Sequence, residues 1–159
     1  MNAFDLIEMK IPAKAEYVSV ARLSIAGIAN RMGFDYEAIE DLKVAISEAV
    51  TNTVQHAYAS DGYGEVTIEC GVYADRLEMI VTDRGDSFNM EEIKRSFGPY
   101  KRTKPVENLH EGGFGLYIID ALMDHVEINN TYGVTVLMTK YLRKTEVDLN
   151  GDQISSKQS

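Results

Sequence analysis

Hydrophobic and polar residues alternate along residues 6–12, where the chain reads LIEMKIP. Such alternation is typical of a half-buried strand, and Pro12 marks its end. Residues 16–32 then place apolar side chains at helical spacing, and Gly33 supplies a C-terminal stop. The pattern therefore predicts an early strand followed by a first helix.

A second helix is predicted after Asp35, whose side chain can cap it. Its apolar positions form one continuous stripe: Ile39, Leu42, Ala45, Ile46, Ala49, Val50, Thr53 and Val54. Amid this stripe, Glu48, Asn52 and His56 recur at four-residue intervals. An acid, an amide and an imidazole in one row are the first candidates for chemistry.

The middle of the chain predicts a hairpin and then a long loop. Residues 65–73 place Val66, Ile68, Cys70 and Val72 on one face, and RLEMIVTD follows after a short connection. After Asp83 the periodicity stops, and glycine, proline and mixed charge dominate as far as the EGGFG string. A long irregular segment within a compact domain is usually a functional loop.

Order returns with GLYIIDALMD, which predicts a helix beginning at or just after the glycines, and with two closing strands in HVEINN and GVTVLMTKYL. These elements predict an α+β fold, a two-layer sandwich whose mixed, mainly antiparallel sheet carries helices on one face. We expect one domain over residues 1–144. Residues 145–159 form a polar tail that we expect to fray.

Composition narrows the setting. A chain of 159 residues with 45% hydrophobic and 26% charged residues can bury one core. A net charge of −9 argues against general affinity for nucleic acid or anionic membranes, since phosphate binding normally needs a basic face. The single cysteine cannot form an intramolecular disulfide, and neither a signal sequence nor a membrane-spanning run is seen. We therefore expect a soluble, cytoplasmic protein.

Glu48 and Asn52 lie one helical turn apart, so their oxygens can converge on one water or one hard cation such as Mg²⁺. Taken alone, an ExxxN pair more often marks the solvent face of a helix. His56, near the predicted helix end, fits a group that compensates the helix dipole. The three scattered histidines and one cysteine show no zinc-ligand spacing.

Two further strings suggest nucleotide chemistry, and each has a plain structural alternative. Asp83 at a strand end can accept a hydrogen bond from an exocyclic amine, and Gly85 lets a flat base approach, although DRGD could equally be a turn. Gly112, Gly113 and Gly115 can expose backbone amides to phosphate oxygens, or can act as a hinge. The P-loop pattern GxxxxGK[ST] is absent, and no GxGxxG follows the first strand.

The order of these features resembles the GHKL (Bergerat-fold) ATP-binding domain over nearly the whole chain. More closely, the chain resembles the RsbW and SpoIIAB group of anti-sigma factors, which are also serine protein kinases. Five strings carry the resemblance: ISEAVTNTV, DRGDSF, GPY, EGGFGLY and MTKYL.

The resemblance implies a role for each matched residue. Glu48 would be the general base toward a substrate serine, and Asn52 would coordinate the Mg²⁺ that bridges the ATP phosphates. Asp83 would read the adenine amino group with Gly85 beside it. The remaining implied nucleotide contacts are Gly113 and Gly115 at the phosphates, Thr135 in support of the adenine contact, and Lys104 as a candidate phosphate contact.

One position departs from the group. SpoIIAB-like members carry an arginine just ahead of the glycines, where this chain has Glu111. Arg102, Lys101 or Lys104 could take over its contact with the phosphates, and the sequence does not decide among them.

The resemblance also implies partners. The protein would sequester a sigma-B-type sigma factor, phosphorylate a serine of an RsbV-like anti-anti-sigma antagonist, and form a homodimer through its first strand and first helix, in transcription control during stress. The alternative is a nucleotide-dependent binding module with little or no kinase activity, which would not need Glu48. Histidine-kinase and gyrase-like or Hsp90-like alternatives need a phosphoacceptor-histidine module or a transducer domain, and we expect neither here.

Overall fold

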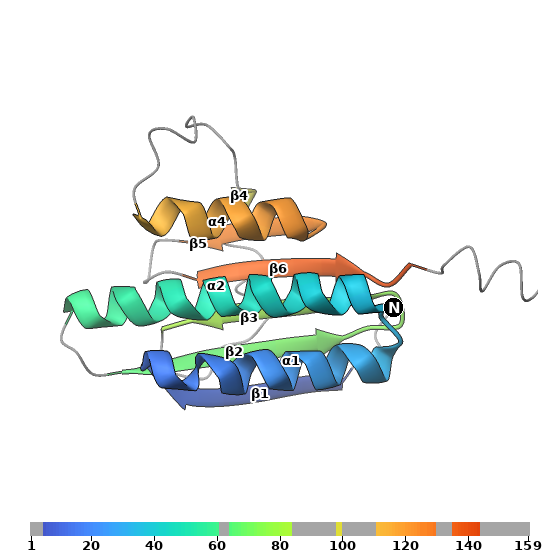
Figure 1. Cartoon of the computed structure of the whole chain (residues 1–159), viewed down its shortest axis with the longest axis horizontal. Helices are drawn as coiled ribbons and strands as arrows, with labels where there is room; N and C mark the ends of the chain where they lie inside the picture. Colours follow the sequence, from blue (N-terminus) through green and yellow to red (C-terminus); the bar gives the residue numbers. More distant parts are fainter. Residues whose placement is uncertain (1–4, 61–63, 84–97, 100–110, 130–134, 144–159) are drawn as a thin grey trace, which may run out of the picture.

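The computed structural model describes residues 5–60, 64–83, 98–99, 111–129 and 135–143. It has two layers, a sheet and three helices that all lie on the same face of it (Figure 1). In chain order the elements are β1 Asp5–Pro12, η1 Ala15–Tyr17, α1 Val18–Met32, α2 Tyr36–Ser60, β2 Glu65–Val72, β3 Arg76–Thr82, β4 Gly98–Pro99, α4 Glu111–Leu122, β5 His125–Asn129 and β6 Thr135–Tyr141.

The six strands follow the order β1-β2-β3-β6-β5-β4. Every strand pairing within the described residues is antiparallel. The expected α+β sandwich with helices on one face is confirmed. None of the described helices combines the length and apolar character needed to cross a membrane.

The connection between α1 and α2 follows the local sequence signals. Gly33 adopts φ 96, a left-handed conformation that glycine reaches without a steric penalty, and its N–H donates to the carbonyl of Asn30 at the end of α1. Two residues later, Asp35 Oδ1 accepts the backbone N–H of Ala38 at 2.8 Å. This is the N-cap that the sequence predicts.

The core lies between the helices and the sheet. The stripe of α2 buries its side chains completely at Leu42, Ala45, Ile46, Ala49 and Val50. Facing it are alternate residues of the central strands: Val66, Ile68, Cys70, Leu77, Met79, Val81, Val136 and Met138. Burial of one such aliphatic side chain contributes about 1.5–3 kcal/mol, so this stripe anchors α2 firmly to the sheet.

The start of α4 corrects one prediction. The helix begins at Glu111, so Gly112, Gly113 and Gly115 lie inside its first turns instead of ahead of it. Glycine costs about 1 kcal/mol relative to alanine in a helix interior. The later residues of α4 offset this cost, because Ile119 is fully buried and Leu116 packs against the same core.

Candidate nucleotide-binding site

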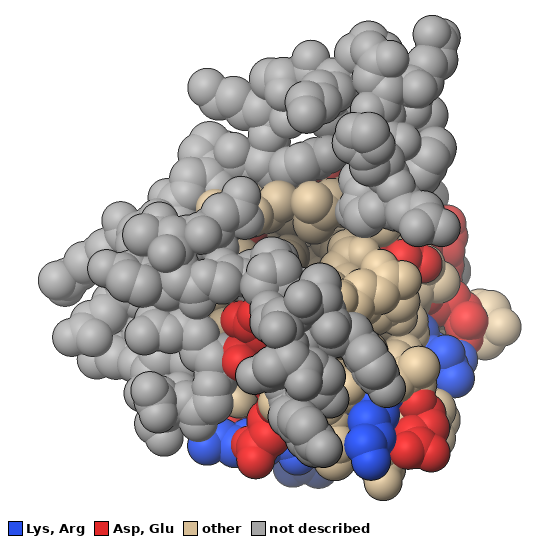
Figure 2. All heavy atoms as spheres, turned by 90° about the vertical axis from the view of Figure 1, so that its left-hand side faces the viewer, with Lys and Arg blue, Asp and Glu red and all other residues tan. Residues whose placement is uncertain are grey.

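The residues singled out by the sequence come from three elements that meet at one end of the molecule. The C-terminal half of α2, the end of β3 and the first turns of α4 lie at the left of Figure 1. Figure 2 looks onto this end, where uncharged residues occupy the middle of the described surface. The visible Lys and Arg side chains lie toward the lower edge, on the side of α1 and β1.

Glu48 and Asn52 lie at the border of the buried stripe of α2. Both side chains are half-buried, and between them lie the fully buried Ala49 and Val50. Thr53 is also fully buried, and its hydroxyl donates to the carbonyl of Ala49 at 2.9 Å. The helix therefore holds its acid and its amide rigidly at the edge of the core.

Asn52 of α2 and Gly115 of α4 meet where the two helices come together. A Cβ atom added to Gly115 would lie 2.7 Å from Asn52 Nδ2 and 3.0 Å from Oδ1. Real Cβ atoms do not approach that closely, so glycine is what lets the two helices come together here.

The amide of Asn52 is also a buried polar group with unused capacity. Its Nδ2 has no hydrogen-bond partner among the described residues. An unsatisfied buried donor costs about 1–3 kcal/mol, so this amide is available to a bound ligand or water molecule that would complete it. In the present orientation of the amide, Nδ2 can donate a hydrogen bond to a phosphate oxygen. The amide turned by 180° presents Oδ1, which suits a hard cation.

A Mg²⁺ ion at Asn52 would take most of its ligands from nucleotide phosphates and water. The described residues contain no cluster of three or more His, Cys, Asp or Glu side chains able to hold a metal ion. Mg²⁺ is commonly held by one or two protein groups together with substrate phosphates and water. A single protein ligand, the amide of Asn52 beside Glu48, is therefore enough for Mg²⁺ that binds together with a nucleotide.

Asp83 directly follows β3, and Thr135 begins β6 opposite the last residue of β3. Thr82 pairs with Thr135, and their hydroxyl oxygens are 2.9 Å apart in a buried hydrogen bond. Val81 and Val136 belong to the core beneath the helices, so the two threonines point to the opposite face. Asp83, half-buried, comes directly after the end of β3.

This arrangement shows a residue that the sequence reasoning missed. Thr82, the residue directly before Asp83, shares a hydrogen bond with Thr135. The only signal in the sequence is that both threonines occupy strand ends. Recognising them as partners requires the β3–β6 register.

Some predicted residues cannot be placed. Gly85 and Lys104 lie outside the described residues, as do Lys101 and Arg102. Gly113 lies within α4, two residues before Gly115. His56 lies within α2, with its side chain outside the description.

Fold and site together define a nucleotide-binding domain of the GHKL class. The family model described as a histidine kinase-like ATPase domain matches residues 11–140. The chain is 58% identical to the serine-protein kinase RsbW of Oceanobacillus iheyensis over 99% of this chain and 100% of that protein. It is 57% identical to the RsbW of a Bacillus cereus strain over 98% of this chain and 97% of that one.

The chain belongs to the RsbW family of ATP-dependent serine-protein kinases. Among solved structures, the RsbU and RsbW domains of a Mycobacterium tuberculosis protein align with a TM-score of 0.61. That alignment covers 89% of this chain and 34% of the other at 21% identity, so it supports the fold alone.

Proposed function

We propose that this protein transfers the γ-phosphoryl group of ATP to a serine of a partner protein at the site formed by α2, α4 and the end of β3. The observation that carries the proposal is the contact of Asn52 with Gly115, which leaves a buried amide donor without a described partner. In this proposal, Asn52 binds Mg²⁺ and the ATP phosphates, free backbone amides in the first turn of α4 around Gly113 contact phosphate oxygens, and Gly115 keeps the approach to Asn52 open. Lys104 is proposed as a further phosphate contact.

Glu48 is proposed as the general base. Its half-buried carboxylate lies one turn from Asn52, so a serine hydroxyl presented to the phosphate would come within its reach. The carboxylate takes the proton from the serine Oγ as the Oγ–P bond forms and the bond from phosphorus to the ADP oxygen breaks. Mg²⁺ supplies charge neutralisation at the phosphates when bound. The protein's own contribution is positioning and proton removal.

At the other side of the nucleotide, Asp83 is proposed to accept a hydrogen bond from the adenine amino group, with Gly85 leaving room for the base. Thr135 would support this contact indirectly, through its hydrogen bond to Thr82 and hence through the backbone that carries Asp83.

We further propose that the protein is an anti-sigma factor of the cytoplasm, in keeping with the resemblance. It would hold a sigma-B-type sigma factor and phosphorylate an RsbV-like antagonist that competes for it. The nucleotide-dependent binding module without kinase activity is the alternative, and Glu48 discriminates between the two because binding alone needs no base. Incubation with radiolabelled ATP, Mg²⁺ and the antagonist tests this: phosphoserine should form with the wild type, and undiminished transfer by Glu48→Ala would contradict the role of Glu48.

A homodimer through β1 and α1 completes the proposal. β1 is an edge strand with Leu6 and Ile7 exposed, and α1 exposes Val20 and Leu23. An exposed edge of this length normally needs covering. Two copies of β1 paired antiparallel about Met9 would set the Glu8 of each copy against the Lys10 of the other.

The charge pairing gives this dimer a specific test by sedimentation. Lys10→Glu should weaken association, because it sets acids against acids. The double variant Glu8→Lys with Lys10→Glu should restore association. A dimer unaffected by Lys10→Glu would contradict this register.

A further inference from the structure

Lys140 lies in the MTKYL string, to which no part of the proposed site gives a role. It follows Val136 and Met138 on the face of β6 that is covered by the helices. Its side chain is only 15% exposed. A lysine on the covered face of a sheet needs partners for its ammonium group, since burial of an unpaired charge is costly.

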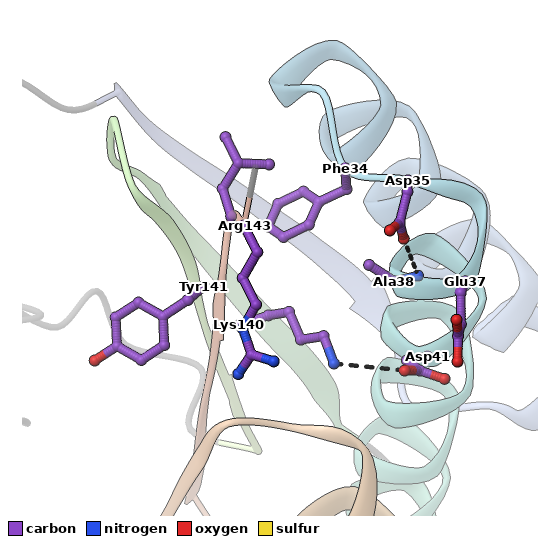
Figure 3. Close-up of a pocket in the computed structure, with 9 residues that line it drawn as sticks. Phe34, Asp35, Glu37, Ala38, Asp41, Lys140, Tyr141 and Arg143 are labelled. Carbon is purple, nitrogen blue, oxygen red and sulfur yellow. Dashed lines mark hydrogen bonds and ion pairs between the residues drawn. The ribbon is translucent and has the colours of Figure 1, made fainter. Parts of the chain in front are cut away.

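The ammonium group of Lys140 bridges the two helices. Nζ donates to the carbonyl oxygen of Leu122 at 2.7 Å and lies 3.4 Å from Asp41 Oδ2. Leu122 is the last residue of α4, where backbone carbonyls lack partners within the helix and a positive charge is favourable. Asp41 belongs to α2. Figure 3 shows Lys140 reaching toward Asp41. Both residues line a pocket of about 260 Å³.

The same two helices meet again at the proposed nucleotide site. α2 and α4 run antiparallel (Figure 1). At a rise of 1.5 Å per residue, Asn52 lies about 16 Å along α2 from Asp41, and Gly115 about 10 Å along α4 from Leu122. The helix pair is therefore joined at one end by Lys140, and at the other Asn52 lies close against Gly115.

Other polar contacts near the C-terminal end of α4 are made by Asp124, and their partners lie outside α2. Asp124 accepts the N–H of Tyr141 at 2.7 Å and pairs with Arg143 at 2.7 Å. These contacts join the segment after α4 to Tyr141 at the end of β6 and to Arg143 just beyond it, not to α2. The ammonium group of Lys140, in contrast, contacts both the end of α4 and an α2 side chain.

We propose that Lys140 is a positioning residue for nucleotide binding. By joining the end of α4 to α2, it sets the spacing between the helices and keeps Gly115 against Asn52. The proposal rests on the nucleotide role assigned above to these two residues. Without the ammonium group, α4 stays attached to the sheet but can shift relative to α2.

The first test measures the Kd of a non-hydrolysable Mg·ATP analogue by calorimetry. Lys140→Met, similar in length but uncharged, should raise the Kd by about fivefold. Lys140→Arg should recover most of the affinity, because arginine can donate to both partners. Arg143→Ala is the matched control: it removes the neighbouring ion pair with Asp124, in which the Arg143 side chain is 77% exposed, and should leave the Kd unchanged.

A double-mutant cycle separates positioning from a general loss of stability. Gly115→Ala should weaken binding because its methyl group pushes against Asn52. If Lys140 holds α4 in place, this penalty should be smaller by about threefold in the Lys140→Met background, where α4 can yield. Penalties that simply multiply would overturn the proposal, as would an unchanged Kd for Lys140→Met.

A measurement without nucleotide distinguishes this inference from the proposed function. The NMR signals of the Asn52 side-chain amide should shift in Lys140→Met and stay in place in Arg143→Ala. If these signals do not move, the positioning role is wrong even where wild-type protein binds ATP. If the wild type binds no ATP while the signals shift, the nucleotide role is wrong and the helix coupling stands.

Discussion

The side-chain amide of Asn52 faces Gly115 so closely that a methyl group at that glycine would lie 2.7 Å from Nδ2. This contact joins α2, which carries polar residues beside an apolar stripe, to α4, which has glycines in its first turns. It determines how near α2 and α4 can come, and it leaves a buried donor for a ligand to satisfy. The first prediction tests it directly.

Gly115→Ala should separate stability from binding. Alanine favours the helix by about 1 kcal/mol over glycine, and this gain opposes any loss of stability. The free energy of unfolding should therefore fall by less than it does in a variant that opens a cavity in the core, and it can even rise. The affinity for Mg·ATP should nevertheless drop by about tenfold, since the methyl group displaces the amide of Asn52. Calorimetry and urea unfolding of the same preparation measure the two quantities.

Gly27→Ala is the control for this experiment. Gly27 lies within α1, and a Cβ there would meet no atom within 4 Å. This variant should have a higher free energy of unfolding, because alanine favours the helix, and should bind ATP like the wild type. Equal affinities for the two alanine variants would show that the contact with Asn52 has no part in binding.

Glu48→Gln should keep nucleotide binding and lose phosphoryl transfer. Glutamine preserves the shape of the side chain but cannot take a proton, and a positioned general base contributes about 10²–10⁴-fold to rate. Single-turnover transfer to the antagonist, followed with radiolabelled ATP, measures the loss. A rate within a factor of about two of the wild type would exclude proton removal by this residue.

The hydrogen bond between Thr82 and Thr135 should affect ATP binding through Asp83 as well as stability. Thr135→Val removes the hydrogen bond between the two hydroxyl groups, at a cost of about 0.5–1.5 kcal/mol in unfolding free energy. Thr82→Val should cost a similar amount, and the double variant less than the sum of the two. If Thr135 supports Asp83, each single variant should also weaken ATP binding, whereas a purely structural pair would leave the Kd unchanged.

Stability should fall as the pH rises through neutrality, because of Glu69. This carboxyl is 2% exposed and lies opposite Glu8 in the β1–β2 register. Burial, followed by a hydrogen bond and charge repulsion from Glu8, raises the pKa of Glu69 to about 7. The pKa is higher in the folded state, so the stabilisation is complete below about pH 4.5 and is lost through pH 7, at most about 3 kcal/mol.

Urea unfolding between pH 5 and pH 8 checks this dependence. Glu69→Gln, which stays neutral, should flatten the curve and be more stable than the wild type at pH 8. Glu65→Gln, an exposed acid on the same strand, serves as the control and should keep the wild-type slope. Curves for Glu69→Gln and wild type that run parallel would refute the raised pKa.

Local signals account for most of the secondary structure. The alternation in residues 6–12, the Asp35 cap and the Gly33 stop act within a few residues, so they can be interpreted without knowing the partners. The start of α4 could not be predicted in this way. Glycine strings disfavour a helix locally, and only packing of the later residues, Ile119 foremost, offsets that preference.

The chain by itself determined the α+β class, the buried stripe of α2, and a row of polar residues that resembles the kinases of this family. Tertiary structure alone decided which residues meet. Asn52 reaches Gly115 across 63 positions of sequence, Thr82 reaches Thr135, and Lys140 reaches both α2 and the end of α4. Side-chain spacing along one element follows from its periodicity. Contacts between elements depend on strand register and helix approach, which only the packed core sets.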